Sequence, residues 1–392
     1  MKIAYFLHTA KATDGSSKAF LHLMHDLLAK GIIPLIILPH KGEICQILHN
    51  MNIQYVVLSW TARPSTYPWS QTFQDKLLFI PRLVGRLLVN TLATLQSIKM
   101  VRKFKPDIIH TNTSILAIGY YTASLLHIPH IWHIREYGAL DFNYYYYYPN
   151  RQKQLSRYHK DRSYTISITK DIQCYNALTN WCNSEVIYDG VLPLNSTHYN
   201  AKKSDYLLFV GSFQKAKGVV PLIHAYAEYC KRMHSPLPLL IAGGGSNEYK
   251  QQIIDIIKKY GIMDQVKLLG LCKDILPLYH NAKALIVPSL FEGFGFITAE
   301  AMFCGCLVIG NNTAGTKEQF DNGLEMTGEE IALRYTKQEE LVQHLIDVTN
   351  NPTRHYEPMI LRAQQVVAQL YSTEKHAERV YEFYNYILNQ NT

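Results

Sequence analysis

Residues 284–310 read ALIVPSLFEGFGFITAEAMFCGCLVIG, and this stretch decides the fold that we expect. A short apolar run ends at Ser289, and a loop with two glycines follows it. An apolar helical pattern then begins near Phe296 and ends at Gly305, directly before a second apolar run. Buried strands that alternate with helices form parallel sheets with helices on both faces. The stretch therefore predicts a strand–helix–strand unit of an α/β protein.

The same alternation runs through the chain in two series. The first contains the apolar runs KIAYFLH, PLIILP, DIIHTN and HIWHI, and the second restarts with DYLLFVG and PLLIAGGG. The pattern weakens over residues 186–200, and 392 residues exceed the roughly 250–300 that one core supports. We therefore expect two Rossmann-like domains, residues 1–190 and 191–371, with a terminal helix over 372–392 packed back on the first. Ligands of such sheets bind at the carboxyl ends of the strands, which predicts a site in a cleft between the domains.

Charge is distributed unevenly along the chain. Residues 1–200 hold 20 Lys and Arg against 11 Asp and Glu, whereas the remainder holds 19 against 20. The basic excess favours an anionic partner for the first domain, such as a membrane surface or a phosphate-bearing acceptor. No nucleic-acid motif accompanies it, so we expect no nucleic-acid partner.

The seven cysteines are dispersed and form no C-x-x-C pair, which argues against a disulfide framework or a zinc site. No apolar run approaches the ~20 residues of a membrane span, and the first residues lack a signal-peptide pattern. We expect a cytoplasmic protein, either free or at the inner face of the cell membrane.

Two glutamates, Glu292 and Glu300, are the only charges in the loop and helix of the opening stretch. The helix start after Gly293 and Gly295 offers unpaired N–H groups, which attract anions such as phosphate. Glu292 can then accept hydrogen bonds from sugar hydroxyls, and Glu300 from a ribose diol. The alternative is structural, with Glu292 capping the helix and Glu300 paired with a buried lysine.

A second segment, VGSFQKAKGVV over residues 210–220, ends a strand at Gly211 and carries Lys215 and Lys217 ahead of a helix. Lysine is a good point-charge partner for phosphate. The order of three segments resembles the C-terminal half of the family 4 glycosyltransferases, which are retaining enzymes of GT-B fold. The three segments are VGSFQKAKGVV, LLIAGGG and the opening stretch. The resemblance is close over residues 205–320, including the E-x7-E pair. It is fainter in DGSSKAF, HIREYG, ISITKDI and VIYDGV of the first half. It implies an α/β protein in which two Rossmann-like domains have parallel sheets facing across a cleft.

The resemblance also assigns roles to individual positions. Catalytic roles go to Glu292 at the transferred sugar, Lys217 at the diphosphate, and His133, after the strand IPHIW, near the 6-position of the sugar. The donor-binding set is Gly15, Gly211, Ser212, Lys215, Lys217, Gly293, Phe294, Gly295, Phe296 and Glu300. The acceptor-side set is His110, Asn112, Arg135 and Glu136, of which the last two have a local ion pair as the alternative.

The chain departs from the family pattern at three places. Ser212 stands where the family has Arg, and Lys215 is a candidate to restore that charge. Asp189 stands where Asn is commoner, and DGSS lacks the usual second glycine. No D-x-D sequence is present, so we expect no metal and no cofactor besides the nucleotide-sugar donor.

The function implied is a retaining glycosyltransferase of the hexosyltransferase type (EC 2.4 class). It moves a sugar from a nucleotide-diphosphate sugar, such as a UDP-sugar, to a hydroxyl of a glycan or lipid-linked glycan. The expected pathway is the assembly of bacterial surface polysaccharide, as capsule, O-antigen or exopolysaccharide. Two alternatives stay open: a non-catalytic nucleotide-sugar-binding or scaffold protein, which Ser212 favours, and a nucleotide-sugar epimerase of the same fold.

Two features of the first half concern the acceptor or a membrane. Residues 79–107 are apolar on one face and basic elsewhere, which suits either an anionic membrane surface or ordinary helices with a solvated basic side. The run Tyr144–Tyr148 is expected in a loop that stacks on sugars, lies at a lipid interface or packs the linker.

Overall fold

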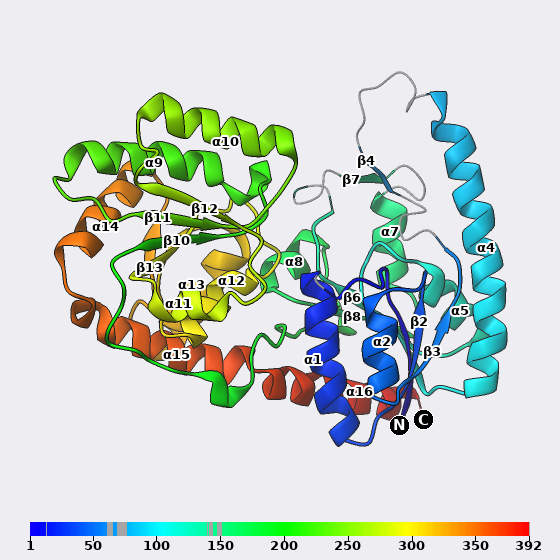
Figure 1. Cartoon of the computed structure of the whole chain (residues 1–392). Coiled ribbons are helices and arrows are strands. Elements are labelled where there is room, and N and C mark those ends of the chain that lie inside the picture. The colour runs from blue at the N-terminus through cyan, green and yellow to red at the C-terminus, as the bar shows by residue number, and fades with distance from the viewer. Residues whose placement is uncertain are drawn as a thin grey trace. The chain divides into compact units, whose positions relative to one another are not determined.

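The structure, a computed structural model, describes residues 1–12, 14–60, 66–68, 77–138, 140, 144–146 and 151–391. It divides into two units (Figure 1): unit 1 is Met1–Gly190 with Thr373–Thr392, and unit 2 is Val191–Ser372. Each unit contains one large parallel sheet with helices packed against it. The predicted fold class, α/β with two Rossmann-like sheets, is confirmed.

The sheet of unit 1 has seven strands in the order β3-β2-β1-β5-β6-β8-β9, and each neighbouring pair is parallel. The strands are β1 (Lys2–Phe6), β2 (Ile33–Leu38), β3 (Gln54–Val57), β5 (Ile108–Thr111), β6 (His130–Ile134), β8 (Ser163–Ser167) and β9 (Ser184–Val186). The strand order reverses between β1 and β5. A reversal of this kind opens the space where α/β sheets bind ligands, at the carboxyl ends of the two strands.

Helices cover both faces of this sheet. They are α1 (Gly15–Ala29), α2 (Glu43–Asn50), α4 (Phe79–Phe104), α5 (Ile118–Leu126), α7 (Arg151–Tyr158), α8 (Lys170–Tyr175) and α16 (Thr373–Asn391). Alternate residues of β1 supply the two cores, as the two-residue period of a strand requires. Ile3 and Tyr5 pack in the core that includes α1 and α16, and Ala4 and Phe6 pack in the core that includes α4 and α5. The last helix therefore completes the core of unit 1.

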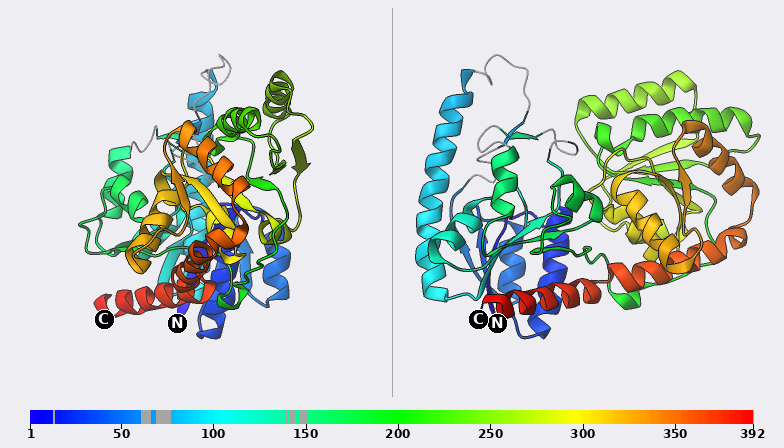
Figure 2. Two further views of the ribbon diagram at one scale, coloured as in Figure 1. Left: turned by 90° about the vertical axis from the view of Figure 1, so that its left-hand side faces the viewer. Right: turned by 180° about the vertical axis from the view of Figure 1, so that it is seen from behind.

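The sheet of unit 2 has six parallel strands in the order β12-β11-β10-β13-β14-β15. The strands are β10 (Leu207–Val210), β11 (Leu239–Ala242), β12 (Val266–Gly270), β13 (Ala284–Val287), β14 (Leu307–Asn311) and β15 (Leu333–Tyr335). The helices are α9 (Val219–Arg232), α10 (Asn247–Tyr260), α11 (Leu276–Asn281), α12 (Phe296–Phe303), α13 (Ala314–Thr327), α14 (Gln338–Asn350) and α15 (Glu357–Tyr371). Figure 2 shows them on both sides of the sheet. This order reverses between β10 and β13, the two strands that precede the motifs singled out above.

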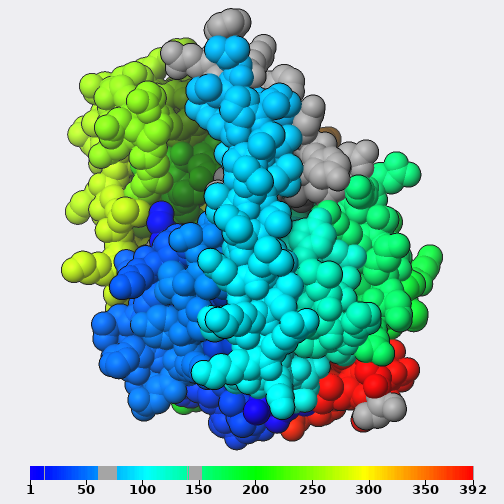
Figure 3. Space-filling view, turned by 90° about the vertical axis from the view of Figure 1, so that its right-hand side faces the viewer, coloured from blue at the N-terminus to red at the C-terminus, as the bar shows by residue number. Residues whose placement is uncertain are grey.

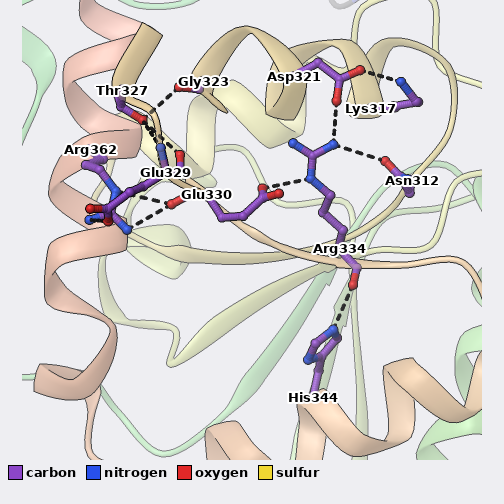
Figure 4. A network of polar contacts seen from close by, with 10 residues as sticks. All are labelled: Asn312, Lys317, Asp321, Gly323, Thr327, Glu329, Glu330, Arg334, His344 and Arg362. Carbon is purple, nitrogen blue, oxygen red and sulfur yellow. Dashed lines mark hydrogen bonds and ion pairs between the residues drawn. The ribbon is translucent and has the colours of Figure 1, made fainter. Parts of the chain in front are cut away.

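A polar network ties α13 to the edge strand β15 (Figure 4). Arg334 donates to Glu330 at 2.8 Å and to Asp321, and its backbone carbonyl lies 2.8 Å from the His344 ring. The Arg334 side chain is only 17% exposed, so these bonds are partly shielded from water. They fix the C-terminal part of α13. The first turn of this helix contacts the loop between β13 and α12 that carries Glu292, which we call the glutamate loop, since Gly315 N–H donates to the Glu292 carbonyl at 2.9 Å.

Residues 79–104 form one helix of 26 residues, α4. Two expectations about local structure were wrong. Tyr144–Tyr146 form strand β7, antiparallel to β4 (Thr66–Pro68), where a loop was expected; Tyr147 and Tyr148 lie outside the described residues. His133 lies inside β6, because pairing with β8 continues through Ile134.

Candidate functional site

The loops after β10 and β13 meet at the reversal point of unit 2. Lys217, in the short 3-10 turn Lys215–Lys217, donates to both carboxylate oxygens of Glu292, at 2.7 and 2.8 Å. Ser289 also donates to Glu292, at 2.8 Å. The carboxylate is 10% exposed and the lysine 27%, so the ion pair sits at the surface of unit 2 and is open on the lysine side. The structure thus brings together two of the three residues predicted to be catalytic.

Backbone contacts hold these two loops together. Leu290 N–H donates to the Ala216 carbonyl at 2.8 Å. Gly218 has φ +69°, and a Cβ there would lie 2.0 Å from the Pro288 carbonyl oxygen. Only glycine combines that left-handed conformation with so close an approach. Gly218 therefore lets the lysine turn reach the glutamate loop.

The glutamate loop leads into α12 through Gly295, whose φ is +92°. Gln319 of α13 donates to the carbonyls of Phe294 and Gly295 at 2.7 and 3.1 Å. No side chain caps the start of α12. The structural alternative for Glu292, a helix cap, is therefore wrong, since its carboxylate binds Lys217 and Ser289 instead.

The other predicted donor residues lie on the same two loops or beside them. Glu300, in the second turn of α12, accepts a hydrogen bond from the Tyr279 hydroxyl at 3.1 Å. Burial and the neighbouring Glu300 charge raise the pKa of Tyr279, so this tyrosine stays a protonated donor. Lys215 is exposed and Ser212 is half-buried in the loop after β10. Contacts of these residues with a nucleotide sugar stay predictions.

Unit 1 gathers the predicted acceptor-side residues at its own reversal point. Arg135, after β6, donates to Asn112, after β5, at 3.1 and 3.3 Å, and its Nη1 bonds both carboxylate oxygens of Asp189. Asn112 in turn donates to the Ser16 carbonyl at 3.3 Å, beside Gly15 at the exposed start of α1. Burial raises the pKa of Asp189, and the guanidinium partly offsets that rise. Asp189, which departs from the family pattern, is thus the counter-charge of a buried arginine.

Glu136 does not pair with Arg135. Its Oε1 accepts from the Thr113 hydroxyl at 2.6 Å and from the Ser114 N–H and hydroxyl at 2.9 and 2.7 Å. The suggested local ion pair between Arg135 and Glu136 is therefore wrong. His110, Asn112, Arg135 and Glu136 are all less than a tenth exposed, and they bind one another or their own unit. Contact of these side chains with an acceptor stays a prediction.

A chain of hydrogen bonds runs through the buried rings of unit 1. Tyr5 and Tyr384 hydroxyls lie 3.1 Å apart, Tyr384 lies 2.7 Å from His110 Nδ1, and His110 Nε2 lies 3.1 Å from His133 Nδ1. Burial, helped by the Arg135 charge, lowers the pKa of His110 to about 3 and that of His133 well below its usual value. Both rings are therefore neutral. Arg135 contacts His133 Nδ1, and because a guanidinium group can only donate hydrogen bonds, His133 Nδ1 must be the acceptor. The proton of His133 is then on Nε2.

His133, Asp189 and His376 also form a potential cation site. One ligand atom from each lies within 4.8 Å of the others, and all three are buried. The carboxylate lies 3.9 Å from His133 Nε2 and 3.8 Å from His376 Nε2. However, Arg135 already places a positive charge on both oxygens of Asp189, and this charge opposes a metal ion there. We assign no cation to this group.

Sequence reasoning missed three members of these clusters, namely Ser289, His376 and Tyr384. His376 and Tyr384 come from α16, more than 180 positions after Asp189, and nothing local marks them as site residues. Ser289 ends the strand run ALIVPS three positions before Glu292, and that spacing was a usable signal.

The comparisons with known proteins address unit 2 most directly. Residues 196–366 match the sequence model of the family described as glycosyl transferases group 1. Unit 2 is a group 1 glycosyl transferase domain. The chain is 29% identical over 117 residues to the serotype-specific mannosyltransferase WbdA of Escherichia coli, covering 29% of this chain and 14% of that protein. It is 31% identical over 121 residues to an N-acetylgalactosaminyltransferase of Campylobacter jejuni that acts on a diphospho-undecaprenol-linked sugar, covering 31% and 32%. The chain thus spans under a third of the length of these relatives.

Solved structures share the fold over the whole chain. The Alr3699/HepE protein of Anabaena, solved in complex with UDP, superposes with a TM-score of 0.76 at 17% identity, covering 98% of this chain and all of that one. The lipopolysaccharide outer core galactosyltransferase WaaB superposes with a TM-score of 0.70 at 16% identity, covering all of both chains. The group 1 glycosyl transferase domain therefore sits in a chain with the two-sheet GT-B fold.

Proposed function

We propose that this protein is a retaining glycosyltransferase that moves a hexosyl group from a nucleotide-diphosphate sugar to a hydroxyl of a glycan or lipid-linked glycan. The observation that carries the proposal is the Lys217–Glu292 pair at the reversal point of unit 2, beside the uncapped start of α12. The mannosyl- and N-acetylgalactosaminyltransferases named above support the reaction class, and the UDP complex of the Anabaena protein supports a UDP-sugar donor.

The pair is suited to exchange partners when a donor binds. Lys217 is the more exposed member, so its ammonium group can turn to the diphosphate while its aliphatic stem stays in place. Glu292 would then keep the Ser289 hydrogen bond and accept hydrogen bonds from sugar hydroxyls. Glu300, about one turn into α12, takes the ribose.

In the reaction, the bond between the anomeric carbon and the diphosphate oxygen breaks. A bond from the acceptor hydroxyl forms on the same face of the sugar, and the acceptor proton passes to the leaving diphosphate. Negative charge grows on the diphosphate as the bond breaks. Lys217 and the amides at the start of α12 stabilise that charge, and a preorganised donor of this kind is worth about 3–4 kcal/mol of barrier. No residue is required as a strong base, and we propose that no metal takes part.

The test compares binding with turnover. Glu292→Gln should keep UDP affinity within a few fold and lower turnover by about 100-fold or more. Lys217→Ala should weaken UDP itself, and Lys258→Ala, at an exposed position of α10, is the matched control. Titration calorimetry with UDP and ADP, followed by donor hydrolysis and transfer assays, measures both quantities. Equal loss of UDP binding and turnover in Glu292→Gln would make the glutamate structural and contradict its role at the sugar.

The scaffold alternative rests on Ser212, which leaves the loop after β10 without the arginine of the family pattern. The same titration decides it, because a scaffold without a donor site binds no nucleotide sugar. The epimerase alternative predicts free nucleotide release without an acceptor, together with exchange of solvent deuterium into the sugar. Ser212→Arg should tighten UDP binding if the missing cation limits the diphosphate site.

We propose surface polysaccharide assembly as the pathway and the cytoplasmic side of the cell membrane as the place. Support comes from the relatives that act in serotype-specific and lipid-linked glycan synthesis and from the basic excess of residues 1–200. Within the described residues, the helices are too short or too polar to cross a bilayer.

A further inference from the structure

Helix α4 of unit 1 has its polarity reversed with respect to an ordinary surface helix. The positions that it buries against the unit are Asn90, Ala93, Thr94, Ser97 and Val101. The positions that it turns outward include Leu88, Leu92 and Leu95, which are 62%, 60% and 58% exposed. A surface helix normally buries its leucines and exposes its polar residues.

The buried side of α4 is polar because its contact with α5 is close. Ser97 shares a hydrogen bond with Thr122 of α5, and Thr94 donates to the Asn90 carbonyl at 2.8 Å. The hydroxyl groups on this side are thus satisfied by hydrogen bonds within α4 and to α5. The unit thus gains no core from the leucines of this helix.

The first part of α4 makes even less use of its apolar side chains. Residues 77–89 include no buried residue, although Leu77, Ile80 and Val84 are among them, at 67%, 52% and 50% exposed. These turns extend past the strands of the sheet (Figure 1), and Figure 3 looks onto their outer side. A helix that exposes apolar side chains in this way requires a further surface to cover them.

The outward residues form a single stripe. Ile80, Val84, Leu88, Leu92 and Leu95 follow one another at spacings of four, four, four and three, so they lie on one face of the helix. The same spacing continues through Lys99 and Arg102, both exposed. The stripe is therefore apolar over about 24 Å and basic at its C-terminal end.

The charge around this stripe decides whether a second copy of the chain or an anionic lipid surface covers it. Residues 77–104 contain Arg82, Arg86, Lys99, Arg102 and Lys103 and no acidic residue. A second copy of the chain placed face to face on α4 would bring these positive charges together. An anionic lipid surface offers both the hydrocarbon that the leucines lack and the negative charge that the basic residues attract.

We propose that the stripe Ile80, Val84, Leu88, Leu92 and Leu95, with Lys99 and Arg102, is a docking face for an anionic lipid bilayer. The stripe lies in the interface plane, with the leucines in the acyl region and the basic end among the headgroups. Unit 1 would then be held at the membrane, where a lipid-linked acceptor resides. The proposal goes beyond sugar transfer and is tested without donor or acceptor.

The test uses the full chain and vesicles of phosphatidylglycerol mixed with phosphatidylcholine, beside vesicles of phosphatidylcholine alone. Leu88→Glu/Leu92→Glu alters the stripe. Leu324→Glu/Leu361→Glu is the matched control, since it places the same two charges at leucines of unit 2 that are 40% and 45% exposed. Lys99→Gln/Arg102→Gln isolates the contribution of the basic end. Thermal unfolding without lipid checks that every variant folds.

We expect the chain and the unit 2 control to sediment with the phosphatidylglycerol vesicles, and more weakly as salt rises. Leu88→Glu/Leu92→Glu should lower the partition coefficient at least about tenfold, and Lys99→Gln/Arg102→Gln by a similar factor. Failure of the unaltered chain to bind these vesicles at low salt would overturn the proposal, and so would equal binding by the stripe and control variants. A lipid-free dimer that Leu88→Glu/Leu92→Glu converts to monomer would replace the bilayer with a second copy of the chain.

Discussion

Unit 1 should lose its stability over a narrow range of mildly acidic pH. His110, His130, His133 and His376 are each at most 2% exposed. Burial lowers the pKa of all four, to about 3 for His110 and well below the usual value of 6.5 for the others. In the unfolded chain the same residues regain a pKa of about 6.5.

The sign and size of the effect follow from this difference. The folded pKa values lie below the unfolded ones, so the unfolded chain binds more protons as the pH falls from 6.5. The stability is therefore fully present above pH 6.5 and is lost as the pH falls toward the folded pKa values. For His110, a change from pH 7 to pH 5 removes about 2 kcal/mol. The other three buried histidines add to this loss in the same direction, and the unfolding free energy of a typical domain is only about 5–15 kcal/mol.

Tryptophan fluorescence can follow unit 1 alone. The four tryptophans of the sequence, at positions 60, 69, 132 and 181, all fall in residues 1–190. Urea titrations at half-unit steps from pH 7.5 to pH 5 give the unfolding free energy at each pH. His110→Gln should reduce the slope by about 1.4 kcal/mol per pH unit below pH 6, whatever its effect at pH 7. His40→Gln, at an exposed position of the same unit, controls for the loss of a histidine.

An unfolding free energy that stays constant between pH 7 and pH 5 would refute this reasoning. It would mean that the buried rings accept protons without unfolding, for instance by ion pairing with Asp189. An unchanged slope in His110→Gln would assign the pH dependence to other groups.

Three further predictions concern single contacts. Asp189→Ala should lower the unfolding free energy of unit 1 by about 3–5 kcal/mol, because it leaves the Arg135 charge buried and unpaired. Adding Arg135→Met to this variant should restore part of the lost stability, and a double variant that is no more stable than Asp189→Ala would contradict this reasoning. Gly218→Ala should lower the melting temperature of unit 2 in calorimetry and weaken UDP binding, because a Cβ would lie 2.0 Å from the Pro288 carbonyl oxygen; unchanged melting would show that the two loops separate easily. Arg334→Gln should cost unit 2 about 1–2 kcal/mol in urea denaturation, since its partners are partly exposed, and a neutral result would make the network of Figure 4 incidental.

The regular part of the fold could be predicted from sequence because local pattern and global packing agree there. The strand–helix–strand unit around Glu292 appears as expected, with α12 beginning at Phe296. Lys217 meets Glu292 because the strand order places β10 beside β13. The local periodicity of the sequence does not predict which strands are neighbours in the sheet. The sequence resemblance carried that information instead.

The rest depended on contacts far apart in the chain. Tyr144–Tyr146 pair as a strand with residues nearly 80 positions earlier, and a run of identical aromatic residues has no period that predicts this. The role of Asp189 required its partner Arg135, and the ring chain required Tyr384 from the last helix. On α4 the apolar stripe was visible, but the polar character of its buried side appears only in the structure.

The division of unit 1 between the two ends of the chain sets an order for folding during synthesis. The core of unit 1 includes Ala377, Val380 and Ile387 of α16, and His110 is bonded to Tyr384 of the same helix. A ribosome that has completed Gly190 must add the whole of unit 2 before α16 emerges, which takes roughly 10–40 s at ~5–20 residues per second. Unit 2 is a continuous segment and can fold in that interval, whereas the first 190 residues wait with part of their core open. The second unit of the chain is therefore the first to be finished, and the incomplete first unit is the stage of synthesis most exposed to chaperones and proteases.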